Sequence, residues 1–119
     1  MTIKDFVNKA MEQDDRNVFE PCDTVDNLPK DIVEFYKNDN PVDVELNFEG
    51  IIVRFFPYDE LEMVQKEYAL PESAFVFATS NGDPIYLMEG EIYIGLHGSL
   101  DNSGELFAES LEKLFDKIS

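Results

Sequence analysis

The chain has 119 residues, of which 44% are apolar, including ten Phe and five Tyr. This length predicts a single domain, 1–119, and the apolar fraction predicts a folded core. Nine Lys and Arg residues stand against 26 Asp and Glu, which gives a net charge of −17 at pH 7. A surface this negative repels phosphate backbones and anionic lipids, so we expect no nucleic acid and no membrane as partner. Such a surface attracts a protein with a basic surface. The alternative interpretation is that the negative charge serves solubility alone.

The single cysteine, Cys22, excludes an internal disulfide and predicts a reducing compartment. Lys4, Asp5 and Lys9 interrupt the apolar residues at the start of the chain, so we expect no signal peptide. The longest apolar stretches, such as 51–53, are far too short to cross a bilayer. We therefore expect a soluble, cytoplasmic protein that is a monomer or a weak homodimer.

The first third of the chain predicts two helices. Residues 2–13 have apolar side chains at helical spacing, and Thr2 and Asp5 have the spacing of a capping box. The expected buried stripe consists of Ile3, Phe6, Val7, Ala10 and Met11. Residues 14–27 predict a polar surface loop, held down by Phe19 and Val25. A second helix is expected from Leu28-Pro29 to about residue 38, with Pro29 in the first helical position.

The middle of the chain predicts a hairpin followed by a helix. Residues 42–48 alternate between apolar and polar side chains, which predicts a strand with one face in the core. Its expected core residues are Val42, Val44, Leu46 and Phe48. Glu49-Gly50 forms the expected turn into a second strand, 51–56, because Gly50 can adopt a positive φ. Residues 58–68 have helical spacing and predict a short helix.

The last part of the chain predicts a three-stranded meander and a final helix. The strands are expected at 75–79, 85–88 and 91–97, with turns at 80–83 and 89–90. Residues 102–118 predict a helix, with a capping box at Asn102 and Glu105. Phe107, Leu111, Leu114 and Ile118 are its expected inward residues. This order of elements predicts an α+β fold with a central antiparallel or mixed sheet of about five strands, flanked by helices.

Four segments resemble one known family. The segment 28–36, Leu-Pro-Lys-Asp-Ile-Val-Glu-Phe-Tyr, resembles the Leu-Pro helix of the SUKH superfamily, the Smi/Knr-like domain. The segment 77–87 is similar to its signature hairpin, in which a Gly-Asp turn joins two apolar strands. The strand at 92–98 and the final helix, at 107–114, are similar to the C-terminal half of the family, so the resemblance covers about residues 24–118. It implies a SUKH-like α+β fold and a non-enzymatic role: bacterial members resemble immunity proteins that neutralise toxins, and eukaryotic relatives resemble regulatory scaffolds.

The residues that catalysis or metal binding would need are scarce. One cysteine and one histidine, Cys22 and His97, allow a Cys/His hydrolase in principle, but the first lies in a polar loop and the second ends a predicted strand. One residue of each type is too few for a structural zinc site, and the segment 101–105 lacks the ligand pattern of an EF-hand calcium loop. Phosphate-binding glycine motifs are absent from the sequence. We therefore expect no catalytic site, no metal and no cofactor.

Carboxylate pairs such as Asp14-Asp15 occur throughout this acidic chain, so each pair says little about acid–base catalysis, and a glycosidase-type dyad remains an alternative. The positive expectation is a protein-binding surface in which acids and one aromatic side chain meet a basic partner. Its candidate residues are Asp43, Glu45, Tyr58, Asp59, Glu60, Glu62, Asp83, Glu89 and Glu91. We expect an immunity protein that binds a cognate toxin, for instance a nuclease; the alternative is a regulatory module that binds an endogenous protein.

Overall fold

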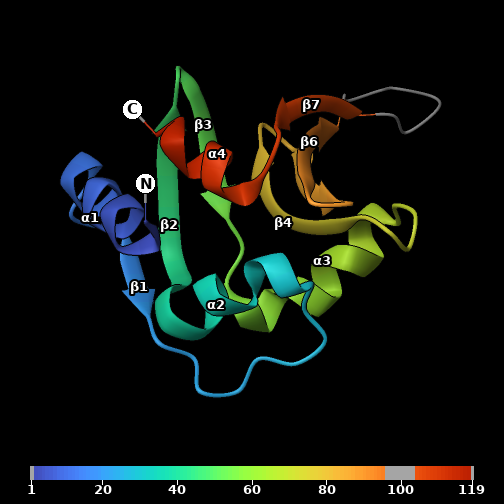
Figure 1. Cartoon of the computed structure of the whole chain (residues 1–119), viewed down its shortest axis with the longest axis horizontal. Helices are drawn as coiled ribbons and strands as arrows, with labels where there is room; N and C mark the ends of the chain where they lie inside the picture. Colours follow the sequence, from blue (N-terminus) through green and yellow to red (C-terminus); the bar gives the residue numbers. More distant parts are fainter. Residues whose placement is uncertain (1, 96–103, 119) are drawn as a thin grey trace.

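The structure is a computed structural model that describes residues 2–95 and 104–118. It has an α+β fold in which one antiparallel sheet of seven strands runs through the molecule in the order of the sequence (Figure 1). The strands are β1 (Val18–Glu20), β2 (Asn40–Phe48), β3 (Ile51–Phe55), β4 (Phe75–Ser80), β5 (Asp83–Met88), β6 (Glu91–Gly95) and β7 (Gly104–Ala108). The helices are α1 (Ile3–Gln13), α2 (Lys30–Asp39), α3 (Leu61–Tyr68) and α4 (Leu111–Asp116), with the 3₁₀ turn η1 (Tyr58–Glu60) before α3.

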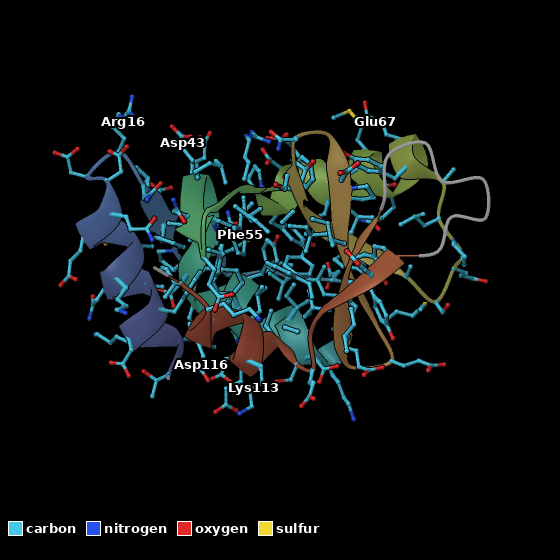
Figure 2. The ribbon with its side chains drawn as sticks, turned by 90° about the horizontal axis from the view of Figure 1, so that it is seen from above. Arg16, Asp43, Phe55, Glu67, Lys113 and Asp116 are labelled. Carbon is cyan, nitrogen blue, oxygen red and sulfur yellow. The ribbon has the colours of Figure 1, made fainter. Side chains whose placement is uncertain are left out.

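Helices pack on both faces of the sheet. The inner face carries α1, α2 and α4: Phe6 of α1 and Phe35 of α2 contact Phe55 of β3, and the phenylalanine of α4 packs against both of them. On the opposite, outer face, α3 packs against β4, and the Tyr68 hydroxyl lies 3.3 Å from the hydroxyl of Thr79. Figure 2 shows the two sides from above: Arg16, Asp43 and Glu67 lie on one side, Lys113 and Asp116 on the other, and Phe55 between them. The sheet is therefore the middle layer of the molecule.

A cluster of phenylalanine rings forms the centre of the core. Phe6 of α1 is fully buried and contacts five other rings at centroid distances of 4.0 to 6.4 Å. These rings are Phe19, Phe35, Phe48, Phe55 and Phe115, so five other elements meet at this one side chain. Because aromatic side chains bury large areas, this cluster supplies much of the hydrophobic stabilisation that joins helices to sheet.

Several expectations are confirmed. Thr2 and Asp5 form the capping box of α1, since each side chain accepts a hydrogen bond from the other residue's backbone N–H. The two central hairpins form at the expected turns, and Gly50 has the expected positive φ of 91°. The segment 58–68 is helical, although its first turn is the tighter 3₁₀ form.

The expected final helix at 102–118 is wrong in its first half. Residues 104–108 form β7, which pairs with β6, and α4 begins only at Leu111. Glu105 therefore belongs to a strand and caps no helix, and its expected partner Asn102 lies outside the described residues. The true N-cap is Ser110, whose side chain accepts a hydrogen bond from the Lys113 N–H at 3.1 Å.

Other expectations need smaller corrections. The sheet has seven strands where about five were expected, because β7 forms and because β1 arises inside the predicted loop at 14–27. All its pairs are antiparallel. Pro29 is the N-cap of α2 and not its first helical residue. Met11 points outward with 51% of its surface exposed, because the buried stripe of α1 is narrower than its apolar spacing suggested.

Candidate functional site

The outer face of the sheet is open on the half formed by β1, β2 and β3. In the β2–β3 hairpin, Glu45 pairs with Arg54 and Asn47 with Ile52, so these four side chains share the outer face. The residues between them along the two strands, Val44, Leu46 and Val53, are buried on the inner face. We define the open outer face as Val18, Asp43, Glu45, Ile52 and Arg54, all of which are exposed.

A β-bulge sets the direction of Asp43. Val18 of β1 pairs with Asp43, but the next residue, Phe19, pairs with Pro41, so Val42 has no partner residue in the ladder. The expectation that Val42 lies in the core is therefore wrong: it is 39% exposed, and Pro41 takes the buried position. Beyond the bulge the alternation resumes, which places Asp43 and Glu45 on the same side of β2.

Beyond the end of β1, side-chain amides form hydrogen bonds with the backbone at the edge of β2. The Asn47 N–H donates to Oε1 of Gln13 (2.8 Å), and Nε2 of Gln13 donates to the Asn47 carbonyl (2.9 Å). The Glu45 N–H donates to Oδ1 of Asn17 (3.0 Å). Asn17 is itself buried and donates to the last turn of α1 at the Ala10 carbonyl (2.8 Å). Gln13 and Asn17 thus satisfy backbone groups that a neighbouring strand would otherwise pair with.

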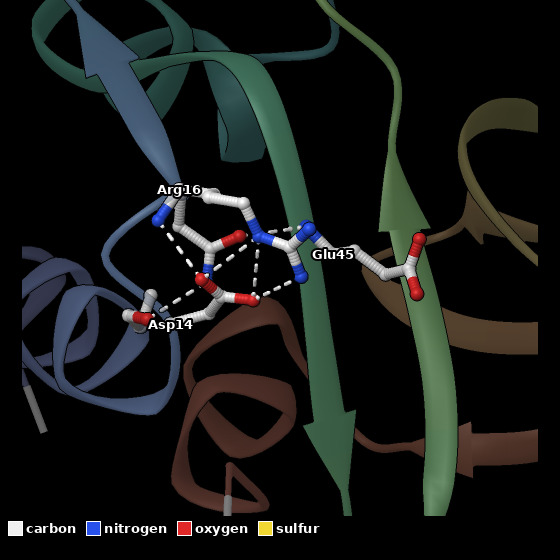
Figure 3. A network of polar contacts seen from close by, with 5 residues as sticks. Asp14, Arg16 and Glu45 are labelled. Atoms are coloured by element: carbon white, nitrogen blue, oxygen red, sulfur yellow. Dashed lines mark hydrogen bonds and ion pairs between the residues drawn. The ribbon is translucent and has the colours of Figure 1, made fainter.

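Both arginines at this face have partners within the chain. Arg16 donates to the Asp14 carboxylate from Nε and Nη2 at 2.9 to 3.2 Å (Figure 3). These hydrogen bonds lower the pKa of Asp14 from 3.8 to about 2. Arg54 lies 3.9 Å from the carboxylate of Glu60 and 5.5 Å from the centre of the Phe56 ring.

Asp43 and Glu45 differ from these paired acids. Within the described part of the chain, neither carboxylate makes a hydrogen bond or an ion pair, and Figure 3 shows the Glu45 side chain pointing away from Arg16. The two residues line a recess of about 210 Å³ together with Asp14, Arg16 and Asn17. The Asp43 carboxylate is attracted by the charge of Arg16, and Glu45 lies opposite Arg54, but neither carboxylate is bound by these arginines. Two such carboxylates beside exposed aliphatic side chains are suited to contact a lysine or arginine of another protein.

The other predicted binding residues are more scattered. Tyr58 is half-buried, and its hydroxyl accepts a hydrogen bond from the Asp26 N–H (2.8 Å), so it anchors a loop of this chain. Asp59 and Glu62 are exposed in η1 and α3, and Glu62 lies 3.8 Å from Lys66. Only Glu60 reaches the open outer face, through Arg54.

The acids of β5 and β6 do not join this group. The strand order places β3 and β4 between β2 and β5, a separation of about 14 Å at ordinary strand spacing. Asp83 begins β5 and Glu89 follows its end, so the two lie about 20 Å apart. Glu91 accepts a hydrogen bond from the Tyr93 hydroxyl at 2.9 Å, which raises the pKa of Tyr93.

Sequence reasoning missed Arg16, Val18, Ile52 and Arg54. Ile52 was assigned to a strand, and its place two residues before Arg54 was a signal that both lie on one face. Val18 gave no comparable signal, because β1 has only three residues and its pairing partner lies more than 20 positions away.

The residues considered for catalysis are not brought into a site that the structure describes. Cys22 is half-buried, with its sulfur 3.5 Å from the Thr24 carbonyl, and His97 lies outside the described residues. Among residues 2–95 and 104–118, no group of three or more His, Cys, Asp or Glu side chains is arranged to hold a metal ion. No helix in these same ranges has the length and apolar character needed to cross a membrane.

No model of a protein family matches the sequence, and no curated protein matches it.

Proposed function

We propose that this chain is a non-enzymatic protein-binding domain: a cytoplasmic immunity protein of the SUKH type that neutralises a cognate bacterial toxin by binding it. The observation that carries the proposal is the open outer face, where the carboxylates of Asp43 and Glu45 form no hydrogen bond or ion pair within the described chain while Val18 and Ile52 expose apolar surface. The resemblance of segments 28–36 and 77–87 to the SUKH pattern supports the class of function.

The charge of the chain supports a basic partner. At −17, the chain attracts cationic surfaces over several ångströms and accelerates their association. A nuclease toxin fits this requirement, because its substrate groove must carry Lys and Arg to bind phosphates. An acidic protein can occupy such a groove and exclude the nucleic acid.

The proposal is tested by co-expressing the chain with the toxin encoded by the neighbouring gene. We expect restored growth and a complex that co-elutes at low salt and weakens as salt rises. Persistent toxicity, with no complex on a sizing column at low salt, would contradict the proposal. A complex with an endogenous protein in place of the toxin would favour the regulatory module.

A further inference from the structure

The two halves of the outer sheet face differ in how they are covered. On the β4 side, α3 packs on the sheet, and its Gln65 side chain bonds to both backbone groups of Val76. On the β1–β3 side the outward residues remain exposed, including Ile52 at 47% and Val18 at 39%. An antiparallel sheet can leave one face to water, but that face is then normally polar along its whole length. Here aliphatic side chains alternate with charged ones.

We propose that the open outer face is the docking surface for the partner, and that it takes a basic element bearing arginine or lysine together with aliphatic side chains. This inference rests on the proposed function and names the surface that the function uses. Asp43 and Glu45 bind the partner's cations, and Val18 and Ile52 contact its apolar side chains.

The charges on this face determine where the partner's cations sit. Asp43 and Glu45 are two residues apart on one side of β2, which separates their Cα atoms by about 7 Å. Across the hairpin, Arg54 is the direct neighbour of Glu45 and repels a second cation. Asp14 and Glu60 already form ion pairs with Arg16 and Arg54. The partner's cations therefore bind over β2, and its uncharged or acidic residues lie over β3.

The partner binds to the face of the sheet and not to the β2 edge. Gln13 and Asn17 already bond to both backbone groups of Asn47 and to the N–H of Glu45, so an incoming strand finds these three groups occupied. Recognition through side chains makes the binding depend on charge at positions 43 and 45, and this dependence can be measured.

Charge reversal with a matched control tests the inference. Asp43→Lys/Glu45→Lys is compared with Glu34→Lys/Glu112→Lys, which makes the same change of net charge at exposed residues of α2 and α4. Binding of the neighbouring gene's toxin domain is measured by calorimetry at low salt, after thermal unfolding has shown that both variants are folded. We expect at least about a 100-fold loss for the first variant and less than about fivefold for the control. Equal losses in the two variants would overturn the inference while leaving the proposed function intact.

If the toxin does not bind, the proposed function is refuted, but the inference about the docking surface can still be tested with a second probe. The probe is a pentapeptide of alternating arginine and leucine, added to the isotopically labelled chain and followed by NMR. We expect the largest shift changes at the amides of Asp43, Glu45 and Ile52, and their loss when citrulline replaces arginine in the peptide. Largest changes at α3, or at the pocket that Leu106, Phe107 and Lys113 line on β7 and α4, would overturn the inference.

Discussion

The side chain of Gln65 in α3 hydrogen-bonds to the edge of β4 beyond the point where the pairing of β4 with β3 ends. The last residues that pair between these strands are Phe55 and Ala78, so the backbone of Val76 has no strand partner on that side. The Val76 N–H donates to Oε1 of Gln65 (2.8 Å), and Nε2 of Gln65 donates to the carbonyls of Val76 (2.7 Å) and Leu61 (3.0 Å). We expect Gln65→Leu to leave two backbone groups of a buried residue unsatisfied.

The magnitude follows from those two groups. Each buried polar group without a partner costs about 1–3 kcal/mol, and the half-buried position of Gln65 lets water replace part of the loss. We therefore expect the free energy of unfolding to fall by about 2–4 kcal/mol. With an unfolding entropy near 2.1 cal/mol/K per residue, this lowers Tm by about 8–15 °C.

Urea unfolding followed by far-UV circular dichroism measures this loss. The matched control is Glu67→Leu, which places the same side chain at an exposed position of the same helix and is expected to change stability by less than about 0.5 kcal/mol. If Gln65→Leu is as stable as the control, the side-chain amide does not support the strand and the reasoning is wrong.

Three further predictions concern the core, the charges and the loop. Phe6→Ala is expected to lower the free energy of unfolding by about 3–5 kcal/mol in urea titrations, against less than about 0.5 kcal/mol for the exposed Met11→Ala on the same helix. An NMR titration of Asp14 is expected to give a pKa of about 2 in the wild type and a return toward 3.8 in Arg16→Ala. Because the folded state lowers this pKa, the Asp14–Arg16 pair stabilises the fold above about pH 4, and this stabilisation is lost as the pH falls toward 2. Tyr58→Phe is expected to cost about 1 kcal/mol and to speed proteolysis of the loop at 21–28, and an unchanged cleavage rate would show that its hydroxyl does not anchor the loop.

Hairpins were predictable from the sequence because their information is local. Apolar runs or alternating apolar residues on either side of Glu49-Gly50, Asn81-Gly82 and Glu89-Gly90 indicate strand, turn and strand within about ten residues. The capping box of α1 is local in the same sense, since it needs only two residues three positions apart.

The remaining elements depend on contacts distant in sequence. The helical spacing of Leu111, Leu114 and Ile118 continues backwards to Phe107, so local periodicity cannot separate β7 from α4. Residues 104–108 form a strand because they pair with β6. Ser110, a favoured N-cap residue directly before Leu111, was the one local signal for the true start of the helix.

The candidate surface was predictable only in part. Asp43 and Glu45 followed from the alternation in β2, because outward positions of a half-buried strand carry polar residues. The lack of an ion pair at either carboxylate, among the residues that the structure describes, could not be predicted, because it depends on Arg16 and Arg54 pairing with Asp14 and Glu60 in three dimensions.

The most direct test of the central claim is an NMR cross-saturation experiment on the complex between the labelled chain and its proposed partner, an unlabelled toxin domain. Docking through the open half of the sheet predicts that saturation of the toxin attenuates the amide signals of β2 and β3, strongest near Asp43 and Ile52. Attenuation centred on α2 or α4 instead, with those strands unaffected, would contradict it.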